Sequence, residues 1–268
     1  MTLKKRFKKW LYGSCPGFAG SFPYCGVKTH FPKGSAIFAR ACEQGIYEQN
    51  ISLLLSSLTK PGTFMFDVGA NIGLTSIPVL TWGENKSVVS FEPSANTLSY
   101  LQKTQAGSGY GERWRIMGKA AGRVPGTIDF FVSAANLGDF DSMIDTGRSG
   151  ARTKQTVEVT TLDATWEELG RPPVSMIKMD IEGAETEALA GAQKLISSER
   201  PSIILEWYEG NLKAYGHDSG SLLKIAADMG YQVLSVPGLV PVDNVPALLA
   251  HMIVAEAFLL LPQGAAGV

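Results

Sequence analysis

The chain has 268 residues, of which 45% are hydrophobic and 18% are charged, and its formal net charge is −1. This length suits one α/β domain with an extension, and the composition excludes a disordered or fibrous protein. Because the net charge is close to zero, the chain as a whole does not attract nucleic acid, and we expect no nucleic-acid partner.

Residues 1–60 are predicted to form an N-terminal segment that caps the active site. Gly, Pro and aromatic residues are frequent up to residue 35, which favours irregular structure, and apolar spacing predicts one helix over Ala36–Leu58. The basic stretch Lys4–Lys9 favours a solvated terminus; a weak contact with a membrane surface is the alternative.

The chain offers no segment apolar and long enough for a signal peptide or a membrane span. Cys15, Cys25 and Cys42 match no usual zinc spacing, and a reduced, cytoplasmic protein is expected.

Residues 61–262 are predicted to form the main domain, followed by a tail at 263–268. Strands are expected at Thr63–Val68, Ser87–Phe91, Trp114–Met117, Val174–Met179, Ser202–Glu206, Tyr231–Val236 and Met252–Glu256, with shorter ones at Thr127–Val132 and Val157–Thr161. Helices are expected at Leu74–Thr81, Ala95–Thr104, Ala184–Ser197 and Ser221–Met229, the first of them short or kinked by Pro78. This alternation predicts an α/β fold with a mostly parallel seven-stranded sheet and helices on both faces.

The first strand of the main domain runs into the turn Asp67-Val-Gly69-Ala70-Asn71-Ile-Gly73. A glycine turn between a strand and a helix brings backbone N–H groups close to a ligand. The spacing D-x-G-x-x-x-G lacks the glycines of the dinucleotide motif and the lysine of the NTPase phosphate loop. The turn therefore favours another nucleoside ligand, although a tight turn without a ligand remains the alternative.

Acidic residues end three further strands. Glu92 follows the second strand, where a carboxylate can accept hydrogen bonds from ribose hydroxyls. Asp180 and Glu182 follow the strand Val174–Met179, and Glu206 ends the next one. Carboxyl ends of parallel strands meet at one edge of a sheet, so these acids are expected beside the turn.

The segments FDVGANIG, FEP, IKMDIEGAETEALAGA and RPSIILEW together resemble the FkbM family of S-adenosylmethionine-dependent methyltransferases. The K-x-D-x-E-G-x-E segment is the most specific part. The resemblance implies a Rossmann-like class I methyltransferase domain over 61–262 with S-adenosylmethionine as cofactor. It places the donor against Gly69, Ala70, Asn71 and Gly73, with Asp67 near its amino group, Glu92 on its ribose and Ala121 near its adenine.

The resemblance further implies O-methylation of a hydroxyl on a sugar, polyketide or similar metabolite, with a small molecule or glycan as acceptor. Asp180 is the first choice for the general base, helped by Glu182 or Glu206; alternatively the three could bind a divalent cation, and His217 is a less favoured base. Acceptor selectivity is expected in residues 1–60 and in the loop Ser133–Ala151. A non-catalytic binding module and a nucleotide-dependent oxidoreductase are the rival functions.

Overall fold

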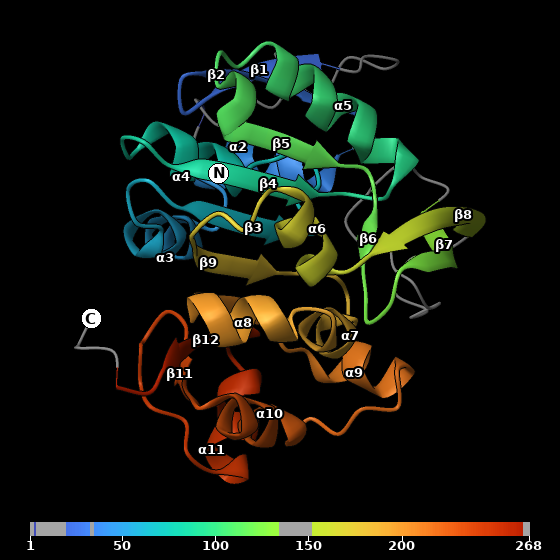
Figure 1. Ribbon diagram of the computed structural model, residues 1–268. Helices are drawn as coiled ribbons and strands as arrows, with labels where there is room; N and C mark the ends of the chain where they lie inside the picture. Colours follow the sequence, from blue (N-terminus) through green and yellow to red (C-terminus); the bar gives the residue numbers. More distant parts are fainter. Residues whose placement is uncertain (1–2, 4–19, 33–34, 134–151, 265–268) are drawn as a thin grey trace.

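The computed structural model describes residue 3 and residues 20–32, 35–133 and 152–264 (Figure 1). A central sheet contains the strands β3 (Phe64–Val68), β4 (Ser87–Phe91), β5 (Trp114–Met117), β9 (Val174–Met179), β10 (Ser202–Glu206), β11 (Tyr231–Ser235) and β12 (Ala257–Pro262). Their order across the sheet is β11-β12-β10-β9-β3-β4-β5.

The central sheet is parallel except at β12, which runs antiparallel to both β10 and β11. The expectation of a mostly parallel seven-stranded sheet is thereby confirmed, whereas the position of the last strand was wrong. Met252 ends the helix α11 (Val245–Met252), which begins where the Asn244 side chain accepts a hydrogen bond from the Ala247 N–H. The strand forms only after this helix.

Two buried clusters cover the two faces of the sheet. Neighbouring residues of each central strand alternate between them: Phe66 packs into one cluster and Met65 into the other. The same alternation separates Ile177 from Met176 in β9. Because successive side chains of a strand point to opposite faces, continuous apolar strands require cover on both sides. Helices on both faces, as predicted, supply that cover, and Figure 1 shows α6 and α8 in front of the sheet.

The helices are α2 (Ala36–Gln44), α3 (Gln49–Leu58), α4 (Ser76–Thr81), α5 (Ala95–Ala106), α6 (Leu162–Glu168), α7 (Glu185–Ala190), α8 (Gln193–Glu199), α9 (Glu209–Ala214), α10 (Ser221–Met229) and α11, with a short 3₁₀ helix at Gly111–Arg113. Two predicted single helices are each divided. Ala36–Leu58 breaks at Gly45, which has φ +88°, and Ala184–Ser197 breaks at Gly191. A Cβ on Gly191 would lie 2.0 Å from the carbonyl oxygen of Gly122, so this close approach of two backbones requires glycine.

Residues 20–31 form a β-hairpin, β1 (Gly20–Tyr24) and β2 (Val27–Phe31), where irregular structure was expected. The two loop residues, Cys25 and Gly26, both have positive φ angles, which matches the twist of a two-residue hairpin. Phe31 stacks on Phe38 of α2 with ring centroids 3.8 Å apart. Alternating apolar residues around the Cys-Gly pair were the signal that indicates this hairpin.

A second small sheet of three strands stands apart from the central one: β6 (Ala120–Ala121), β7 (Gly126–Ser133) and β8 (Arg152–Thr160). Figure 1 shows β7 and β8 beyond the carboxyl ends of β3, β4 and β9. The two predicted short strands correspond to β7 and β8. The loop predicted to select the acceptor lies almost entirely outside the described residues, as does the basic stretch Lys4–Lys9.

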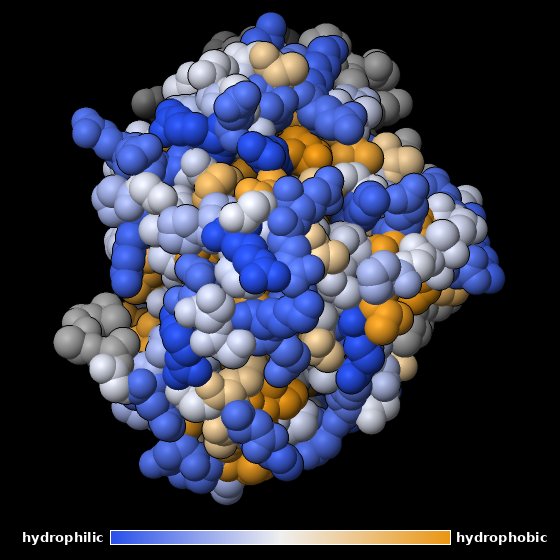
Figure 2. Space-filling model, in the orientation of Figure 1, coloured by the Kyte–Doolittle hydropathy of each residue, from blue (hydrophilic) through white to orange (hydrophobic). Residues whose placement is uncertain are grey.

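The face seen in Figure 2 is mainly hydrophilic, with apolar side chains in separate small groups. In the described part of the chain, every helix is too short or too polar to cross a bilayer. The domain boundary near residue 60 stays a prediction.

Candidate active site

The last residues of four neighbouring strands lie side by side at one edge of the central sheet. Val68 pairs with Phe91 on one side and Met179 on the other, and Met179 in turn pairs with Leu205. The next residues along the chain are Gly69, Glu92, Asp180 and Glu206. Strand register alone therefore brings the glycine turn and the predicted acids together, as expected at this edge of an α/β sheet.

A cavity opens at this edge, and we call it the turn cavity. Seven of the predicted site residues line it: Gly69, Asn71, Glu92, Ala121, Asp180, Glu182 and Glu206. Ala70 lines a small side pocket next to it. Asp67 and Gly73 do not line the turn cavity. The roles of all these residues in binding and catalysis stay predictions.

The glycines of the turn act mainly through close packing. Gly69 has φ +82°, and a Cβ there would lie 2.0 Å from the backbone oxygen of Asp180. A Cβ on Gly73 would lie 2.9 Å from side-chain atoms of Leu101 and Trp114. The backbone N–H groups of Gly69 and Ala70 both donate to the Phe91 carbonyl. The glycines thus let the turn sit tightly between the strand ends, which sets the shape of the cavity wall.

Asp67 supports the turn from behind. It is fully buried, and its Oδ2 accepts hydrogen bonds from the hydroxyls of Thr75 and Ser76 at the start of α4. Its Oδ1 lies 3.7 Å from the Nζ of Lys178, the residue paired with it in β9. The structure therefore places Asp67 in the core beneath the turn, and its proposed contact with a donor amino group stays a prediction.

Lys178 connects this buried acid with the cavity. Its Nζ donates to the Gly69 carbonyl at 3.0 Å and lies 3.3 Å from the Asp180 Oδ2. Burial favours the neutral amine, but the carboxylates of Asp180 and Asp67 outweigh it and raise the pKa of Lys178 above its ordinary value. One ammonium group thus contacts both the glycine turn, through the Gly69 carbonyl, and the carboxylate of Asp180 at the end of its own strand.

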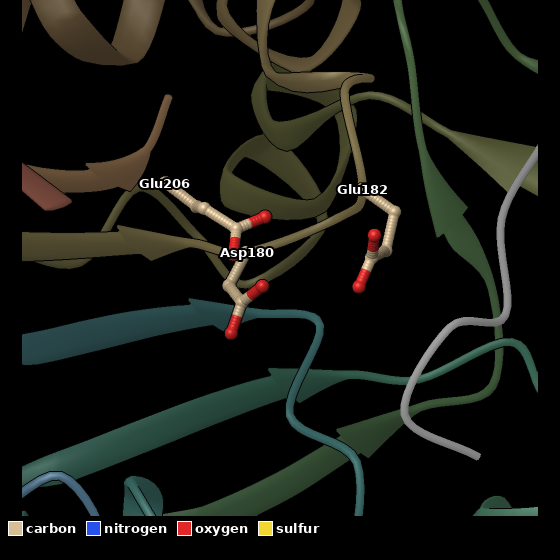
Figure 3. Close-up of side chains that lie close together, drawn as sticks. All are labelled: Asp180, Glu182 and Glu206. Carbon is tan, nitrogen blue, oxygen red and sulfur yellow. The ribbon is translucent and has the colours of Figure 1, made fainter. Parts of the chain in front are cut away.

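Three carboxylates converge in the cavity (Figure 3). Glu206 comes from the end of β10, and Asp180 and Glu182 come from the segment after β9; oxygens from all three lie within 4.8 Å of one another. The Asn211 amide donates to Glu182 at 3.0 Å and to Glu206 at 3.3 Å. Burial first, and then the charges of Asp180 and Glu182, raise the pKa of Glu206 well above its ordinary value.

Three residues that line the turn cavity have left-handed backbone conformations although none is glycine. The φ angles are +44° at Glu48, +51° at Asn71 and +57° at Glu182. Such conformations cost free energy and are retained where the surrounding structure holds them, often at functional sites. At Asn71 the restraint is visible, because its N–H donates to Glu92 Oε2 at 2.8 Å.

Several residues that no sequence pattern indicated also belong to this site. Ile37, Arg40, Tyr47 and Glu48 from the N-terminal segment and Glu256 before β12 all line the turn cavity. For Lys178 the sequence does carry a signal: it precedes Asp180 by two residues, and residues two apart in a strand point to the same face of the sheet. Burial of Glu48 and the nearby Asp180 charge raise the pKa of Glu48.

Two further side chains near these strand ends do not line the turn cavity. Trp207, the residue after Glu206, is fully buried in the core and donates from Nε1 to the Ser219 carbonyl. His217, the less favoured base, lines neither the turn cavity nor its neighbours and stacks on Tyr215 instead.

The buried side chain of Glu185, which follows the cavity acids in the chain, should make the stability of the fold depend on pH. It is buried, its Oε1 accepts a hydrogen bond from the Ile181 N–H, and burial raises its pKa to about 7. Between pH 4.5 and 7 the unfolded chain releases this proton while the folded chain keeps it, so stability falls as pH rises.

Glu185→Gln removes this cost, and the variant should exceed the wild type in unfolding free energy by on the order of 2–3 kcal/mol at pH 8. At pH 4.5 the two should be equal. Urea unfolding at both pH values measures the difference, and an equal gain at both pH values would contradict the assignment.

Comparison with known proteins decides the family. The family model described as the methyltransferase FkbM domain matches residues 67–233, more than half of the chain. The chain belongs to the FkbM methyltransferase family. This family is one of S-adenosylmethionine-dependent methyltransferases. The match includes the turn from Asp67, the acids Asp180 and Glu182, and Glu206.

Several solved structures have a similar fold. An FkbM methyltransferase from Methylobacillus flagellatus is 17% identical with a TM-score of 0.47, and the match covers 85% of this chain and 55% of that one. The chain thus spans just over half of that protein. Fibrillarin from Aeropyrum pernix, solved with bound S-adenosyl-L-methionine, is 11% identical with a TM-score of 0.45, covering 80% and 74%.

A precorrin-6y C5,15-methyltransferase from Geobacter metallireducens is 15% identical with a TM-score of 0.41, covering 70% of this chain and 72% of that one. No curated protein matches the chain.

Proposed function

We propose that this methyltransferase transfers the methyl group of S-adenosylmethionine to a hydroxyl oxygen of a sugar, a polyketide or a similar hydroxylated metabolite. The observation that supports O-directed transfer is the cluster of three carboxylates that lines the turn cavity together with the donor turn. A hydroxyl needs a proton acceptor to become an effective nucleophile, and a positioned base contributes about 10²–10⁴-fold.

In this proposal the donor lies along the turn cavity. Its methionine end contacts Gly69 to Asn71, its ribose bonds Glu92, and its adenine packs near Ala121. Residues 37–48 close the cavity from the other side, in agreement with a capping role for residues 1–60. Holding acceptor oxygen, methyl carbon and sulfur in line supplies part of the ~7–11 kcal/mol that orientation can provide.

Asp180 is the proposed base. It stands between the donor turn and the remaining acids, and Lys178 fixes one of its oxygens at 3.3 Å. The side chain is 32% exposed, so a hydroxyl can reach it. The test is release of S-adenosylhomocysteine by the purified protein across a panel of sugars and polyketides. Donor binding without turnover of any of them would favour a binding module instead.

The contact of Glu92 with ribose predicts weaker donor binding in Glu92→Gln. The two oxygens of Glu92 accept the N–H groups of Asn71 and Ser94, which hold the carboxylate at the wall of the turn cavity, and a carboxylate is an acceptor that suits ribose hydroxyls. Loss of charge-assisted hydrogen bonds should raise the donor Kd by about 10-fold or more. Calorimetric titration of the variant with S-adenosylhomocysteine measures this Kd. An unchanged Kd would show that Glu92 only stabilises the turn and does not contact the donor.

A divalent cation held by Asp180, Glu182 and Glu206 is the alternative to a base, since their oxygens lie within 4.8 Å. Such an ion would lower the pKa of the acceptor hydroxyl. Each acid already has a protein partner, because the Asn211 amide donates to Glu182 and Glu206 and the ammonium of Lys178 pairs with Asp180, which favours the base.

We therefore expect turnover after exhaustive EDTA treatment to stay within about twofold of the untreated enzyme, because the base supplies its effect without a metal. Loss of activity in EDTA that is restored by Mg²⁺ would assign the three acids to a metal.

We further propose a cytoplasmic location for the reaction. Cys25 carries a thiol and is not part of a disulfide, as expected in a reducing compartment.

A further inference from the structure

A second cavity adjoins the turn cavity on the far side of the acids, and we call it the distal cavity. The two share Glu48, Asp180, Glu206 and Glu256, but Gly69, Asn71 and Glu92 line only the turn cavity. The distal cavity has about 590 Å³ against about 210 Å³ for the turn cavity. It lies within the usual 300–1,000 Å³ range of small-molecule sites. The acids thus form a wall between the donor turn and a space large enough for a ring-shaped acceptor.

The wall of the distal cavity combines amides, carboxylates and a few apolar side chains. Gln44 is the last residue of α2, and Gln49 and Asn50 lie in the first turn of α3. Apolar surface comes from Ile46, Ile51 and Val236. Amides donate and accept, and carboxylates accept, so this wall can bond the hydroxyls of a polyol while the apolar side chains cover ring carbons.

The charge of the distal cavity is strongly one-sided. Among its described lining residues, four carboxylates oppose one cation, Lys178. That cation is already engaged, because its Nζ lies 3.3 Å from Asp180 and 3.7 Å from Asp67. A phosphate or carboxylate on the acceptor would meet like charge without a free cation to pair with, and such repulsion is a means of rejecting wrong ligands.

We infer that the distal cavity binds the acceptor of the O-methylation proposed above, and the inference rests on that proposed function. The acceptor is a polyhydroxylated ring that is neutral or positively charged, as in a sugar or an amino sugar. A phosphorylated or carboxylated ring is excluded by its charge. Burial first, and then the neighbouring carboxylates, raise the pKa values of Glu48 and Glu206, and a cationic group on the acceptor would stabilise their ionised forms.

Three probes of equal ring size test the charge selection: D-glucosamine, D-glucose and D-glucose 6-phosphate. Their binding to the full chain saturated with S-adenosylhomocysteine is measured by saturation-transfer NMR. Glucosamine and glucose should bind at least about tenfold more tightly than glucose 6-phosphate at low salt, and the ratio should shrink at high salt.

Glu256→Gln should reduce this preference by about threefold or more, because it removes one charge from the wall. Glu84→Gln, an exposed acid before β4 that lines neither cavity, removes the same charge and should leave the ratio unchanged. Asn50→Trp adds bulk at an exposed position of the distal wall and should abolish binding of all three probes without changing the Kd of S-adenosylhomocysteine.

Any one of three results would overturn the inference. Glucose 6-phosphate could bind as tightly as the other two probes or more tightly, no probe could bind at all, or the probes could still bind to the Asn50→Trp variant. Failure of the proposed function looks different: the wild type would then not bind S-adenosylhomocysteine at all, or would bind the probes without methylating any hydroxylated acceptor.

Discussion

Asp180→Asn should lower kcat by about 10²–10⁴-fold, because an amide has the size of the carboxylate but cannot accept the acceptor proton. The donor should still bind, since the turn and Glu92 are untouched; we expect the Kd of S-adenosylhomocysteine to stay within about threefold of the wild type. Steady-state kinetics at saturating donor, with an acceptor from the panel, measures the first quantity and calorimetry the second.

Glu182→Gln is the matched variant for this test. Glu182 belongs to the same cluster, but its Oε2 is bonded to Asn211 and its backbone is in the left-handed conformation. A loss of only about tenfold is expected there, since the base itself remains. If instead Glu206→Gln shows the large loss and Asp180→Asn does not, the base is Glu206, whose raised pKa makes its anion the stronger proton acceptor.

Gly69→Ala should remove donor binding and destabilise the fold by about 3 kcal/mol. Two causes add: alanine is strained at φ +82°, and its Cβ would stand 2.0 Å from the Asp180 carbonyl oxygen, which forces the turn and the acid apart. Thermal unfolding and calorimetric titration with S-adenosylhomocysteine measure the two effects.

Gly170→Ala separates those two causes. Gly170 has the same φ of +82°, but nothing lies within 4 Å of a Cβ built on it. Only the backbone strain applies, so a loss of about 1 kcal/mol and unchanged donor binding are expected. Equal effects of the two substitutions would show that the contact with Asp180 is unimportant.

The central sheet and the acids at its edge were predictable because they follow from local patterns. Apolar strands between helices predict a parallel sheet, and parallel strands place their carboxyl ends together, so Asp180 and Glu206 could be assigned to one edge from their positions alone. The family segments then identified the donor.

Residues brought to the site by long-range packing could not be predicted in the same way. Glu48 reaches the cavity only because the chain breaks at Gly45 and turns through a left-handed residue before α3, where helical periodicity predicted one continuous helix. Asp67 is the penultimate residue of β3, and it is held in the core because its partners Thr75 and Ser76 lie at the start of the next helix, α4.

The single ammonium of Lys178 has a thermodynamic consequence for the two halves of the site. It bonds the Gly69 carbonyl on the donor side and pairs with Asp180 on the acceptor side. Any ligand or proton that changes one of these contacts changes the free energy of the other, and such coupling is reciprocal. Donor occupancy should therefore alter the affinity for an acceptor that contacts Asp180 by the same factor by which that acceptor alters donor affinity.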